Sequence, residues 1–435
     1  MIDESTDVTT IIEGMREEYL NGTRPWIIGF SSGKDSTCLV QLTYQMLLEL
    51  EPHQRNKRVY ILSTNTMVET PAVALRIKRQ CDTIQKAADR DNLPIDVQLL
   101  RPKITDTFWV NLIGRGYPSP NKWFRWCTSR LKIKPMDEYI LNNIKRNGEV
   151  LILLGTRRAE SSNRAKSMER HKIEDFKLRK HGSIKGAFVY APLEYMTDED
   201  VWNYLLSNKP GWGGDNEELY RLYAGENTEM SFILDGRAPP SGTSRFGCWT
   251  CTVVDKDRAI QSLIDEGHDE YIPLREFRNK LKNIRDDPNC REKYRKNQRL
   301  DKLYEEFYSD KESNDSEEQT LGPFKMSVRH ELLLELLQIQ DDLRKIIPEA
   351  ELISPEEISA IELAWIYDGD DLSFMDENIR NREGNGNEID ALIDRLMVVE
   401  NDMSDVSRRI GIYGKLEKAV YEYTVTKMEK GGGSR

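Results

Sequence analysis

The chain has 435 residues, of which 38% are hydrophobic and 31% charged, and it carries a net charge of −11. This length allows about two or three domains with packed cores. No stretch of roughly 18 consecutive apolar residues occurs, which argues against a membrane-spanning helix. The N-terminus is acidic and polar, unlike a signal or transit peptide. We therefore expect a cytoplasmic protein that makes no use of a membrane.

The charge is distributed unevenly along the chain. Residues 303–371 hold five basic and nineteen acidic residues, whereas residues 157–185 hold ten and four, and residues 275–302 hold eleven and five. The two basic segments are candidates to contact a polyanion such as a nucleotide or DNA. Solvated helix faces with ordinary ion pairs would produce the same composition, so this alternative stays open.

Strands and helices are predicted to alternate after a short helical lead-in over residues 1–22. Apolar runs predict strands at 26–30, 58–63, 95–100 and 150–155, and apolar periodicity predicts helices at 35–50, 70–91 and 132–146. This alternation indicates an α/β fold with a parallel sheet flanked by helices on both faces. Ligands of such folds bind at the carboxyl ends of the strands. The loops after strands 26–30, 58–63 and 150–155 are therefore expected to converge on one crevice.

The second half of the chain has fewer strand signals. A helix is predicted at 196–206 with Thr197 as its N-cap, followed by a Gly/Pro-rich loop at 207–247 and a return to helix from Asp255. The predicted organisation is a lead-in over 1–22, a catalytic domain over 23–308, an acidic linker over 309–324 and a helical C-terminal region over 325–430. We expect this helical appendix to serve as a surface for a partner or an oligomer.

An anion-binding loop is predicted at residues 31–36, Ser-Ser-Gly-Lys-Asp-Ser, between the first strand and the first long helix. Backbone N–H groups and the positive end of a helix favour a phosphate there. The spacing differs from Walker A and resembles the PP-loop, SGGxDS, of the ATP pyrophosphatase and PAPS-reductase superfamily. The nucleotide-binding candidates are Ser31, Ser32, Gly33, Lys34, Asp35 and Ser36.

Three residues of this loop are the catalytic candidates. Lys34 would neutralise the charge of a pyrophosphate leaving group as a point charge. The hydroxyl of Ser36, like that of Ser31, would donate to phosphate oxygens. Asp35 would either orient Mg²⁺ or cap the helix, and the sequence does not distinguish the two roles.

A group of arginines follows strand 150–155. Arg157, Arg158 and Arg164 are expected to bind the nucleotide, because guanidinium groups suit phosphate or sulfonate recognition. Unrelated surface arginines are the alternative.

The six cysteines fall into two sets. Cys38 and Cys81 lie in apolar-periodic helices and are expected to be core residues. Cys127, the CxxC pair Cys248 and Cys251, and Cys290 are candidate ligands. Their spacing alone leaves zinc, a redox pair and an iron–sulfur cluster open, although thiolate-rich ligation favours zinc or iron–sulfur over hard cations.

Further segments resemble the DndC-type proteins of DNA phosphorothioate modification, a group that includes the SspD type of the single-stranded variant. The segments are RWCTSRLKIKP (125–135), LLGTRRAESSNR (153–164), APLEYMTDEDVWNYL (191–205), RFGCWTCTVVDKD (245–257) and LGPFKMSVRHELLLELL from 321. The resemblance spans about residues 15–375. It implies an adenine nucleotide alpha-hydrolase-like fold and an ATP pyrophosphatase that adenylates a DNA phosphate oxygen before sulfur replaces it.

The same resemblance implies cofactors and partners. ATP, Mg²⁺ and a 4Fe–4S cluster are expected, with Cys127, Cys248 and Cys251 as candidate ligands of the cluster. Cys290 is the candidate fourth ligand, although its spacing is irregular, and if it is not a ligand, the fourth iron is open to bind sulfur directly. The implied partners are a cysteine desulfurase, other Dnd or Ssp proteins, and DNA as the substrate.

The chain departs from the pattern at three places. Ser32 replaces the first Gly of the loop, which is expected to require ordinary φ or a shifted loop. Asn65 stands where reductase relatives often carry Asp, which weakens a Mg²⁺ role there, and Trp126 stands where they tend to carry a second Cys before Cys127. A PAPS or APS reductase and a non-catalytic scaffold remain alternatives. A reductase usually needs a C-terminal redox Cys, and no Cys follows residue 290; the intact Lys34-Asp35-Ser36 argues against a scaffold.

Overall fold

The computed structural model describes residues 7–160, 178–224, 248–265, 267–294 and 321–368. The chain divides into two compact units, Met1–Ser354 and Pro355–Arg435. The described part of the second unit is α13, Pro355–Tyr367, and the residue that follows it. The predicted boundaries at residues 22, 308 and 324 stay predictions, and residues 309–320 of the predicted linker lie outside the described residues.

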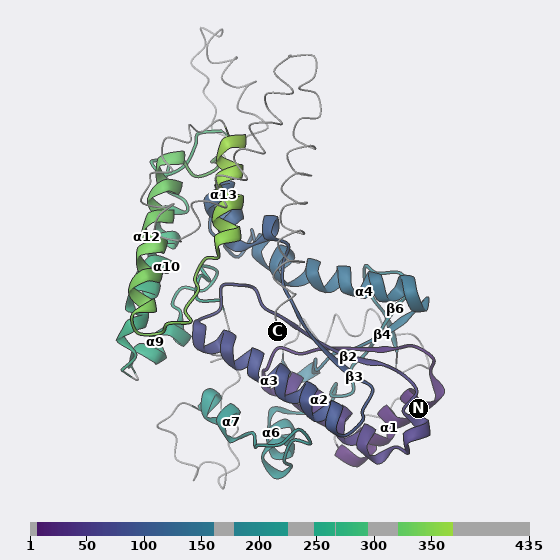
Figure 1. Ribbon diagram of the computed structural model, residues 1–435. Coiled ribbons are helices and arrows are strands. Elements are labelled where there is room, and N and C mark those ends of the chain that lie inside the picture. The colour runs from purple at the N-terminus through teal and green to yellow at the C-terminus, as the bar shows by residue number, and fades with distance from the viewer. Residues whose placement is uncertain (1–6, 161–177, 225–247, 266, 295–320, 369–435) are drawn as a thin grey trace, which may run out of the picture. The chain divides into compact units, whose positions relative to one another are not determined.

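A six-stranded sheet with the order β3-β2-β1-β4-β6-β5 forms the centre of the first unit (Figure 1). All neighbouring pairs are parallel except β5 with β6 at one edge. The strands are β1 Trp26–Gly29, β2 Val59–Thr64, β3 Ile95–Leu100, β4 Val150–Leu153, β5 Arg179–Lys180 and β6 Ala187–Tyr190. The predicted α/β fold with a parallel sheet is confirmed, and β5 and β6 are additional to the predicted strands.

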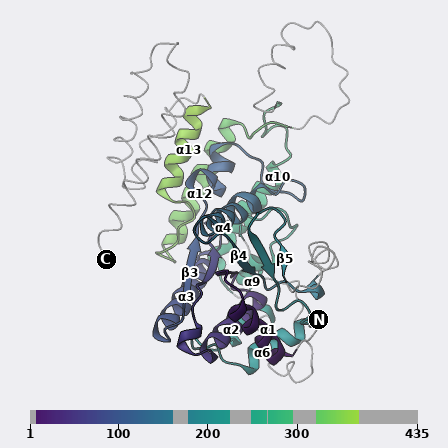
Figure 2. The same cartoon turned by 90° about the vertical axis from the view of Figure 1, so that its right-hand side faces the viewer.

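Helices cover both faces of this sheet (Figure 2). On one face lie α1 Val8–Asn21, α2 Lys34–Glu49, α3 Pro71–Arg90 and α6 Asp198–Ser207, and on the other lies α4 Lys134–Asn147. In β1, Trp26 and Ile28 pack with the first group and Ile27 with the second. A strand that is buried on both faces has a continuous run of apolar residues, and such runs allowed these strands to be predicted from the sequence.

The predicted loop at 207–247 contains a helix, α7 Glu217–Ala224, and this part of the prediction is wrong. Leu219 and Tyr220 are buried, and the ring of Tyr220 meets Trp202 of α6 edge-to-face at 5.2 Å between centroids. This tertiary contact stabilises a short helix. The helix was not predicted because the surrounding Gly and Pro residues are typical of a loop. Residues 225–247 lie outside the described residues.

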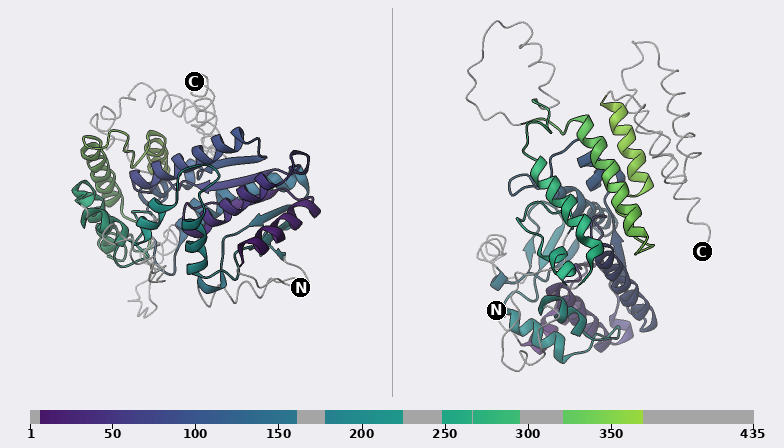
Figure 3. Two further views of the ribbon diagram at one scale, coloured as in Figure 1. Left: turned by 90° about the horizontal axis from the view of Figure 1, so that it is seen from below. Right: turned by 90° about the vertical axis from the view of Figure 1, so that its left-hand side faces the viewer.

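Beyond the sheet, α9 Arg258–Asp265, α10 Ile272–Ile284 and α12 Met326–Arg344 lie side by side (Figure 3). The helix α12 also packs against a π-helical segment, Val110–Gly114, and its buried Arg329 donates to the carbonyl of Gly114 at 3.1 Å. The helix therefore belongs to the first unit. None of the helices within the described ranges is long and apolar enough to span a bilayer.

The arginines at the centre of the basic segment 275–302 are internal. Arg278 is buried and donates to the carbonyls of Cys251 (2.9 Å) and Asp255 (3.0 Å). Arg291 is also buried and donates to the carbonyl of Gly322 at 2.5 Å. These two cations join loops to one another, which corrects the expectation that they are available to a polyanion.

Candidate active site

The predicted anion-binding loop connects β1 to α2 at the position where the strand order reverses between β1 and β4. Gly33 is the N-cap residue of α2 and offers no side chain to its first N–H groups. The N–H of Lys34 donates to the hydroxyl of Tyr223 in α7, at 3.3 Å. A helix N-terminus that opens at such a reversal of strand order is a favourable site for an anionic ligand.

Ser32 retains a conformation that normally requires glycine. Its φ is +58°, in the left-handed region, so the expectation of ordinary φ at this position is wrong. The residue is fully buried, and its hydroxyl has no hydrogen-bond partner among the described residues. Both features cost free energy, which indicates that the loop shape is maintained against a local penalty.

The hydroxyls of Ser31 and Ser36 lie 3.2 Å apart. Ser36 Oγ donates to the carbonyl of Gly33 at 3.0 Å and accepts from the N–H of Ser31 at 3.2 Å. These bonds hold the loop closed on itself. A phosphate that binds Ser36 must therefore exchange one of these partners.

Two cations and two carboxylates alternate at the start of α2. Lys34 Nζ lies 2.9 Å from Asp198 Oδ1 and 3.3 Å from Asp35 Oδ2, and the Lys34 side chain is 4% exposed. Arg157 is 1% exposed, lies 2.7 Å from Asp35 Oδ1 through Nε and also pairs with Asp198. We call these four residues the ion-pair network. It joins the loop after β1, the loop after β4 and the start of α6.

The carboxylate of Asp35 pairs with Lys34 and Arg157, a contact that was not predicted from the sequence. Asp35 lies in the first turn of α2, where a negative charge also interacts favourably with the helix dipole. Gly155 follows β4, and a Cβ there would lie 2.8 Å from the carbonyl oxygen of Asp35. The missing side chain lets the loop after β4 approach α2 closely enough for Arg157 to reach Asp35.

The electrostatics of the network favour its charged form. Burial opposes ionisation of Asp198, but hydrogen bonds from Lys34 and Arg157 outweigh it and hold the pKa of the carboxyl below its ordinary value. Burial likewise opposes the charge of Arg157, and the two carboxylates nevertheless raise the pKa of its guanidinium. The positive charge is therefore present and internally compensated before any ligand arrives.

The structure describes two of the three predicted arginines, and these two have different partners. Arg157 lies in the network, whereas Arg158 pairs with Glu194 at 2.7 Å and lies over the ring of Tyr195. Arg164 lies outside the described residues. Asp198 was missed as a site residue, because its position in the first turn of α6 is explained equally well by helix-dipole effects.

The CxxC loop packs against the loop that follows β2. Cys248 forms an isolated antiparallel bridge with Glu69, and the N–H of Trp249 donates to the carbonyl of Val68 at 3.0 Å. The hydroxyl of Thr66 lies 3.3 Å from Cys248 Sγ and 2.6 Å from Glu69 Oε1. The CxxC pair thus lies beyond the carboxyl end of β2, next in the sheet to the strand that carries the anion-binding loop.

Three of the four candidate ligands act on one another electrostatically, and we call Cys127, Cys248 and Cys251 the cysteine group. Burial raises the pKa of Cys248 to about 12, and the nearby Lys132 opposes this rise. Burial also raises the pKa of Cys127, and the charge of Cys251 adds to the rise while Lys132 opposes it. A soft cation would therefore have to displace protons to bind here.

Cys290 lies in different surroundings. Its thiol lies 3.6 Å from Asp287 Oδ2, and burial together with Asp287 and Glu331 raises its pKa. Across the described residues, no three His, Cys, Asp or Glu side chains are arranged as a ready metal site. The soft donors of the cysteine group and the positive charge of Lys132 nevertheless suit a thiolate-bound cluster in chemical type. Cys38 and Cys81 are buried core residues, as predicted.

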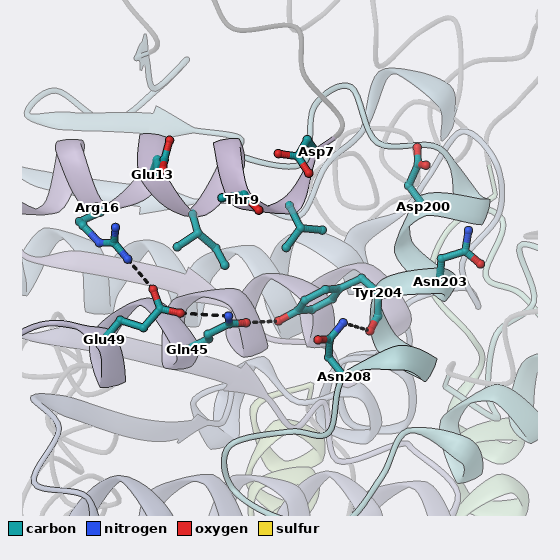
Figure 4. A pocket seen from close by; sticks show the side chains of 12 residues that line it. Asp7, Thr9, Glu13, Arg16, Gln45, Glu49, Asp200, Asn203, Tyr204 and Asn208 are labelled. Atoms are coloured by element: carbon teal, nitrogen blue, oxygen red, sulfur yellow. Dashed lines mark hydrogen bonds and ion pairs between the residues drawn. The ribbon is translucent and has the colours of Figure 1, made fainter.

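A cavity of about 670 Å³ lies between α1, α2 and α6 (Figure 4). Its walls include Gln45, which hydrogen-bonds to Tyr204, and Glu49, which pairs with Arg16. Gln45 is eleven residues beyond Lys34 in α2, or roughly 16 Å along the helix. Four carboxylates and one arginine contribute to its lining, so the cavity disfavours a phosphate and does not coincide with the ion-pair network.

Comparison with known proteins identifies a family. The model of the phosphoadenosine phosphosulfate reductase domain matches residues 25–254, more than half of the chain. Two curated relatives come from Methanocaldococcus jannaschii. The uncharacterized protein MJ0066 is 22% identical over 55% of this chain and 39% of its own length, and MJ0973 is 29% identical over 41% and 35%. The chain thus spans less than two fifths of the length of these relatives.

Solved structures share lower similarity. The phosphoadenylyl-sulfate reductase from Candida auris in a phosphate complex is 14% identical over 49% of this chain and 89% of its own, with a TM-score of 0.28. The U34-tRNA thiolase NcsA from Methanococcus maripaludis with its [4Fe-4S] cluster is 11% identical over 63% and 80%, with a TM-score of 0.29. The family assignment therefore depends on the match over residues 25–254.

The strain at Ser32 is testable by stability. We expect Ser32→Gly to be more stable than Ser32→Ala by about 1 kcal/mol, because glycine adopts positive φ without the steric cost that any Cβ pays. Both variants remove the buried hydroxyl, so their difference isolates the backbone. Urea unfolding of the two proteins measures it. The usual order, with alanine the more stable, would contradict the left-handed conformation.

The role of Asp198 is testable by its charge. Asp198→Asn should lower the free energy of unfolding at pH 7 by about 2 kcal/mol, because charge-assisted bonds to Lys34 and Arg157 are lost. It should also bind inorganic pyrophosphate more tightly, because only Asp35 then competes for the two cations. Thermal unfolding and calorimetric titration give the two readouts. Glu199→Gln, an exposed change in the same helical turn, is the control.

The same pair of proteins has an expected pH dependence. The pKa of Asp198 in the folded state lies below its unfolded value of about 3.9. Its contribution to stability is thus fully present above that pH and is lost as the pH falls through the folded-state pKa. The stability gap between the wild type and Asp198→Asn should shrink below about pH 4. A gap that is unchanged down to the acid limit of folding would sink the assigned pairing.

Proposed function

The chain belongs to the phosphoadenosine phosphosulfate reductase domain family, and on this premise we propose that it is an ATP pyrophosphatase that prepares a phosphate oxygen for replacement by sulfur. The observation that supports this most is the ion-pair network, in which Lys34 and Arg157 converge at the N-terminus of α2. The two cations come from different loops and are oriented before a ligand binds. Cations that are already assembled at the site can stabilise the charge of a leaving group once they have exchanged their carboxylate partners for phosphate oxygens.

The proposed first step cleaves ATP between its α- and β-phosphates. A phosphate oxygen of the substrate attacks the α-phosphorus, the bond from that phosphorus to the bridging oxygen breaks, and pyrophosphate leaves with the electron pair. Lys34 and the amides of residues 33–36 would hold the departing charge, and Arg157 would bind an adjacent phosphate oxygen. Mg²⁺ would enter with ATP, with Asp35 as its proposed protein contact once the cations have turned to the phosphates.

The proposed second step replaces oxygen by sulfur. A sulfide-level nucleophile, released when a thiol reductant supplies two electrons to the desulfurase's persulfide, attacks the adenylated phosphorus of the substrate, and AMP leaves with the original oxygen. Resemblance of residues 125–135, 153–164, 191–205 and 245–257 to DndC-type proteins supports DNA as the substrate and a cysteine desulfurase, with other Dnd or Ssp proteins, as partners. The net products are a phosphorothioate, AMP and pyrophosphate.

The cysteine group is the proposed position of the sulfur chemistry. Cys127, Cys248 and Cys251 would hold a [4Fe–4S] cluster, and Lys132 would stabilise their thiolates. A bound cluster would supply a soft centre for a sulfide-level sulfur atom. Cys290 lies among Asp287, Glu331 and Lys325, which favours a three-cysteine ligand set over a four-cysteine set.

The pyrophosphatase activity is tested by the product of ATP cleavage. Anaerobically purified protein with ATP, Mg²⁺, DNA and a cysteine desulfurase should release pyrophosphate, and Lys34→Met should reduce its rate about 100-fold by removing a charge at the leaving group. Lys145→Met, which removes an exposed charge of α4, is the control. Release of orthophosphate alone would exclude α-phosphate chemistry. No release under any condition would favour the reductase or the scaffold.

The ligand set is tested by iron content. In anaerobically reconstituted protein, Cys127→Ser, Cys248→Ser and Cys251→Ser should each lose the broad absorbance near roughly 400 nm typical of such clusters. Cys290→Ser and the buried-core control Cys81→Ser should keep it. Full iron retention in a variant of the cysteine group removes that cysteine from the ligand set, and loss in Cys290→Ser would restore the four-cysteine set.

A further inference from the structure

An exposed aromatic loop lies beside the cysteine group and has no role in the proposed chemistry so far. Trp123 is 96% exposed and its neighbour Phe124 is 44% exposed, although both follow a stretch that is packed against the protein. A fully exposed tryptophan leaves a large apolar surface in contact with water and gains none of the free energy that burying this surface would provide. Such a side chain on an ordered loop therefore indicates a binding surface.

Hydrogen bonds within the loop fix the backbone at Trp123. Asn121 Oδ1 accepts hydrogen bonds from the N–H groups of Trp123 (2.8 Å) and Phe124 (2.7 Å). An asparagine turn of this kind fixes the backbone without help from neighbouring strands. Trp123 is thus presented to solvent by a defined turn.

The base of the loop is anchored on both sides. The hydroxyl of Thr252, next to the CxxC pair, donates to the carbonyl of Pro120 at 2.6 Å and is buried. Trp126 donates to the carbonyl of Pro118 at 2.9 Å and stacks on Phe108 with 5.3 Å between ring centroids. The exposed tip therefore stands on a packed aromatic base that is continuous with the cysteine group.

The charge around the tip is positive. Residues 121–134 contain five basic residues and no acidic residue. Arg130 and Lys134 pair with Asp106, whereas Lys122, Arg125 and Lys132 are exposed and form no ion pair with a carboxylate of the described residues, although Lys122 contributes to lowering the pKa of Asp255. Lys122 and Arg125 belong to the same loop as the aromatic tip and Lys132 follows it nine residues after Trp123, and all three are exposed, unlike the buried arginines of α10 and the segment after it.

We propose that Trp123 is a stacking platform for an unpaired base of a single-stranded nucleic acid, with Lys122, Arg125 and Lys132 along its phosphate backbone. One ring face suffices for a base, and every base presents a π-face, so stacking between cations is a common mode of single-strand binding. The bases of a duplex are already stacked on one another, so a duplex offers only its backbone phosphates to such a loop. A stable protein partner would need a larger complementary surface than a single turn supplies.

Trp123 lies close to the cysteine group in the chain. Trp123 precedes Cys127 by four residues, so their Cα atoms lie at most roughly 14 Å apart. Lys132 acts electrostatically on both Cys127 and Cys248. A strand stacked on Trp123 would thus carry its backbone past the cysteine group. This role in substrate delivery rests on the proposed function, whereas the binding itself does not.

The test measures oligonucleotide affinity without ATP. A fluorescein-labelled single-stranded thymidine 12-mer is titrated with the full-length protein at low salt, with the matching duplex in parallel. Trp123→Ala should weaken single-strand binding about tenfold, Trp123→Phe should retain most of it, and Trp123→Leu should behave like Ala. Because the side chain is exposed, thermal unfolding of all three should match the wild type. Lys122→Ala and Arg125→Ala should each reduce the slope of log affinity against log salt by about 0.7, unlike Lys145→Ala.

The outcomes separate this inference from the proposed function. Unchanged 12-mer affinity in Trp123→Ala overturns the platform, even where pyrophosphate release persists. Loss of affinity in Trp123→Ala supports it, even where the wild type releases no pyrophosphate. Equal affinity of wild type for duplex and single strand would mean binding through charge alone and would also overturn it. If Trp123→Ala leaves the 12-mer affinity intact and alters sedimentation of the protein, the loop is a contact between copies of the chain.

Discussion

The rest of the site depends on the ion-pair network. Lys34, Asp35, Arg157 and Asp198 come from three segments that are far apart in the sequence, and each cation contacts both carboxylates. Burial of Lys34 and Arg157 would be prohibitive without these partners. The network therefore compensates the charges that are buried where the loop after β4 lies against α2, and it brings two cations together at the N-terminus of α2.

A compensated site of this kind imposes a cost on ligand binding. A phosphate group gains Lys34 and Arg157 only by replacing carboxylates that already bind them, so the affinity reflects a difference between two strong interactions. Occupancy of the site is then coupled to the start of α6 through Asp198 and to α7 through Tyr223, whose hydroxyl meets the N–H of Lys34. The strained backbone at Ser32 lies in the same loop, and its left-handed conformation is maintained although serine pays a steric cost that glycine would not.

The cysteine group is held by a second set of interactions that is independent of the first. The CxxC loop joins the loop after β2 through a backbone bridge, and Arg278 of α10 ties its carbonyls from the other side. Arginine donates several hydrogen bonds in a fixed plane, and that is why Arg278 and Arg291 are buried instead of facing solvent. Positive charge in this chain thus occurs in three settings: two cations buried against carboxylates in the network, arginines that anchor loops around α10, and exposed side chains in the segment that contains Trp123.

Sequence alone determined the parallel sheet, because buried strands such as 26–29 and 150–153 are continuous apolar runs. It also determined the position of the anion-binding loop, because Ser-Ser-Gly-Lys-Asp-Ser lies between a strand and a helix. It did not reveal α7, which depends on the contact of Tyr220 with Trp202, or the role of Asp198, which local helix-dipole effects explain equally well. It also grouped Arg158 with Arg157, since proximity in sequence and residue type are all that a sequence offers, whereas in the structure Arg158 pairs with Glu194. Only the tertiary structure decided which of these side chains share a site, because that depends on how separate loops approach one another, and such approaches are set by packing and ion pairs between residues distant in the chain.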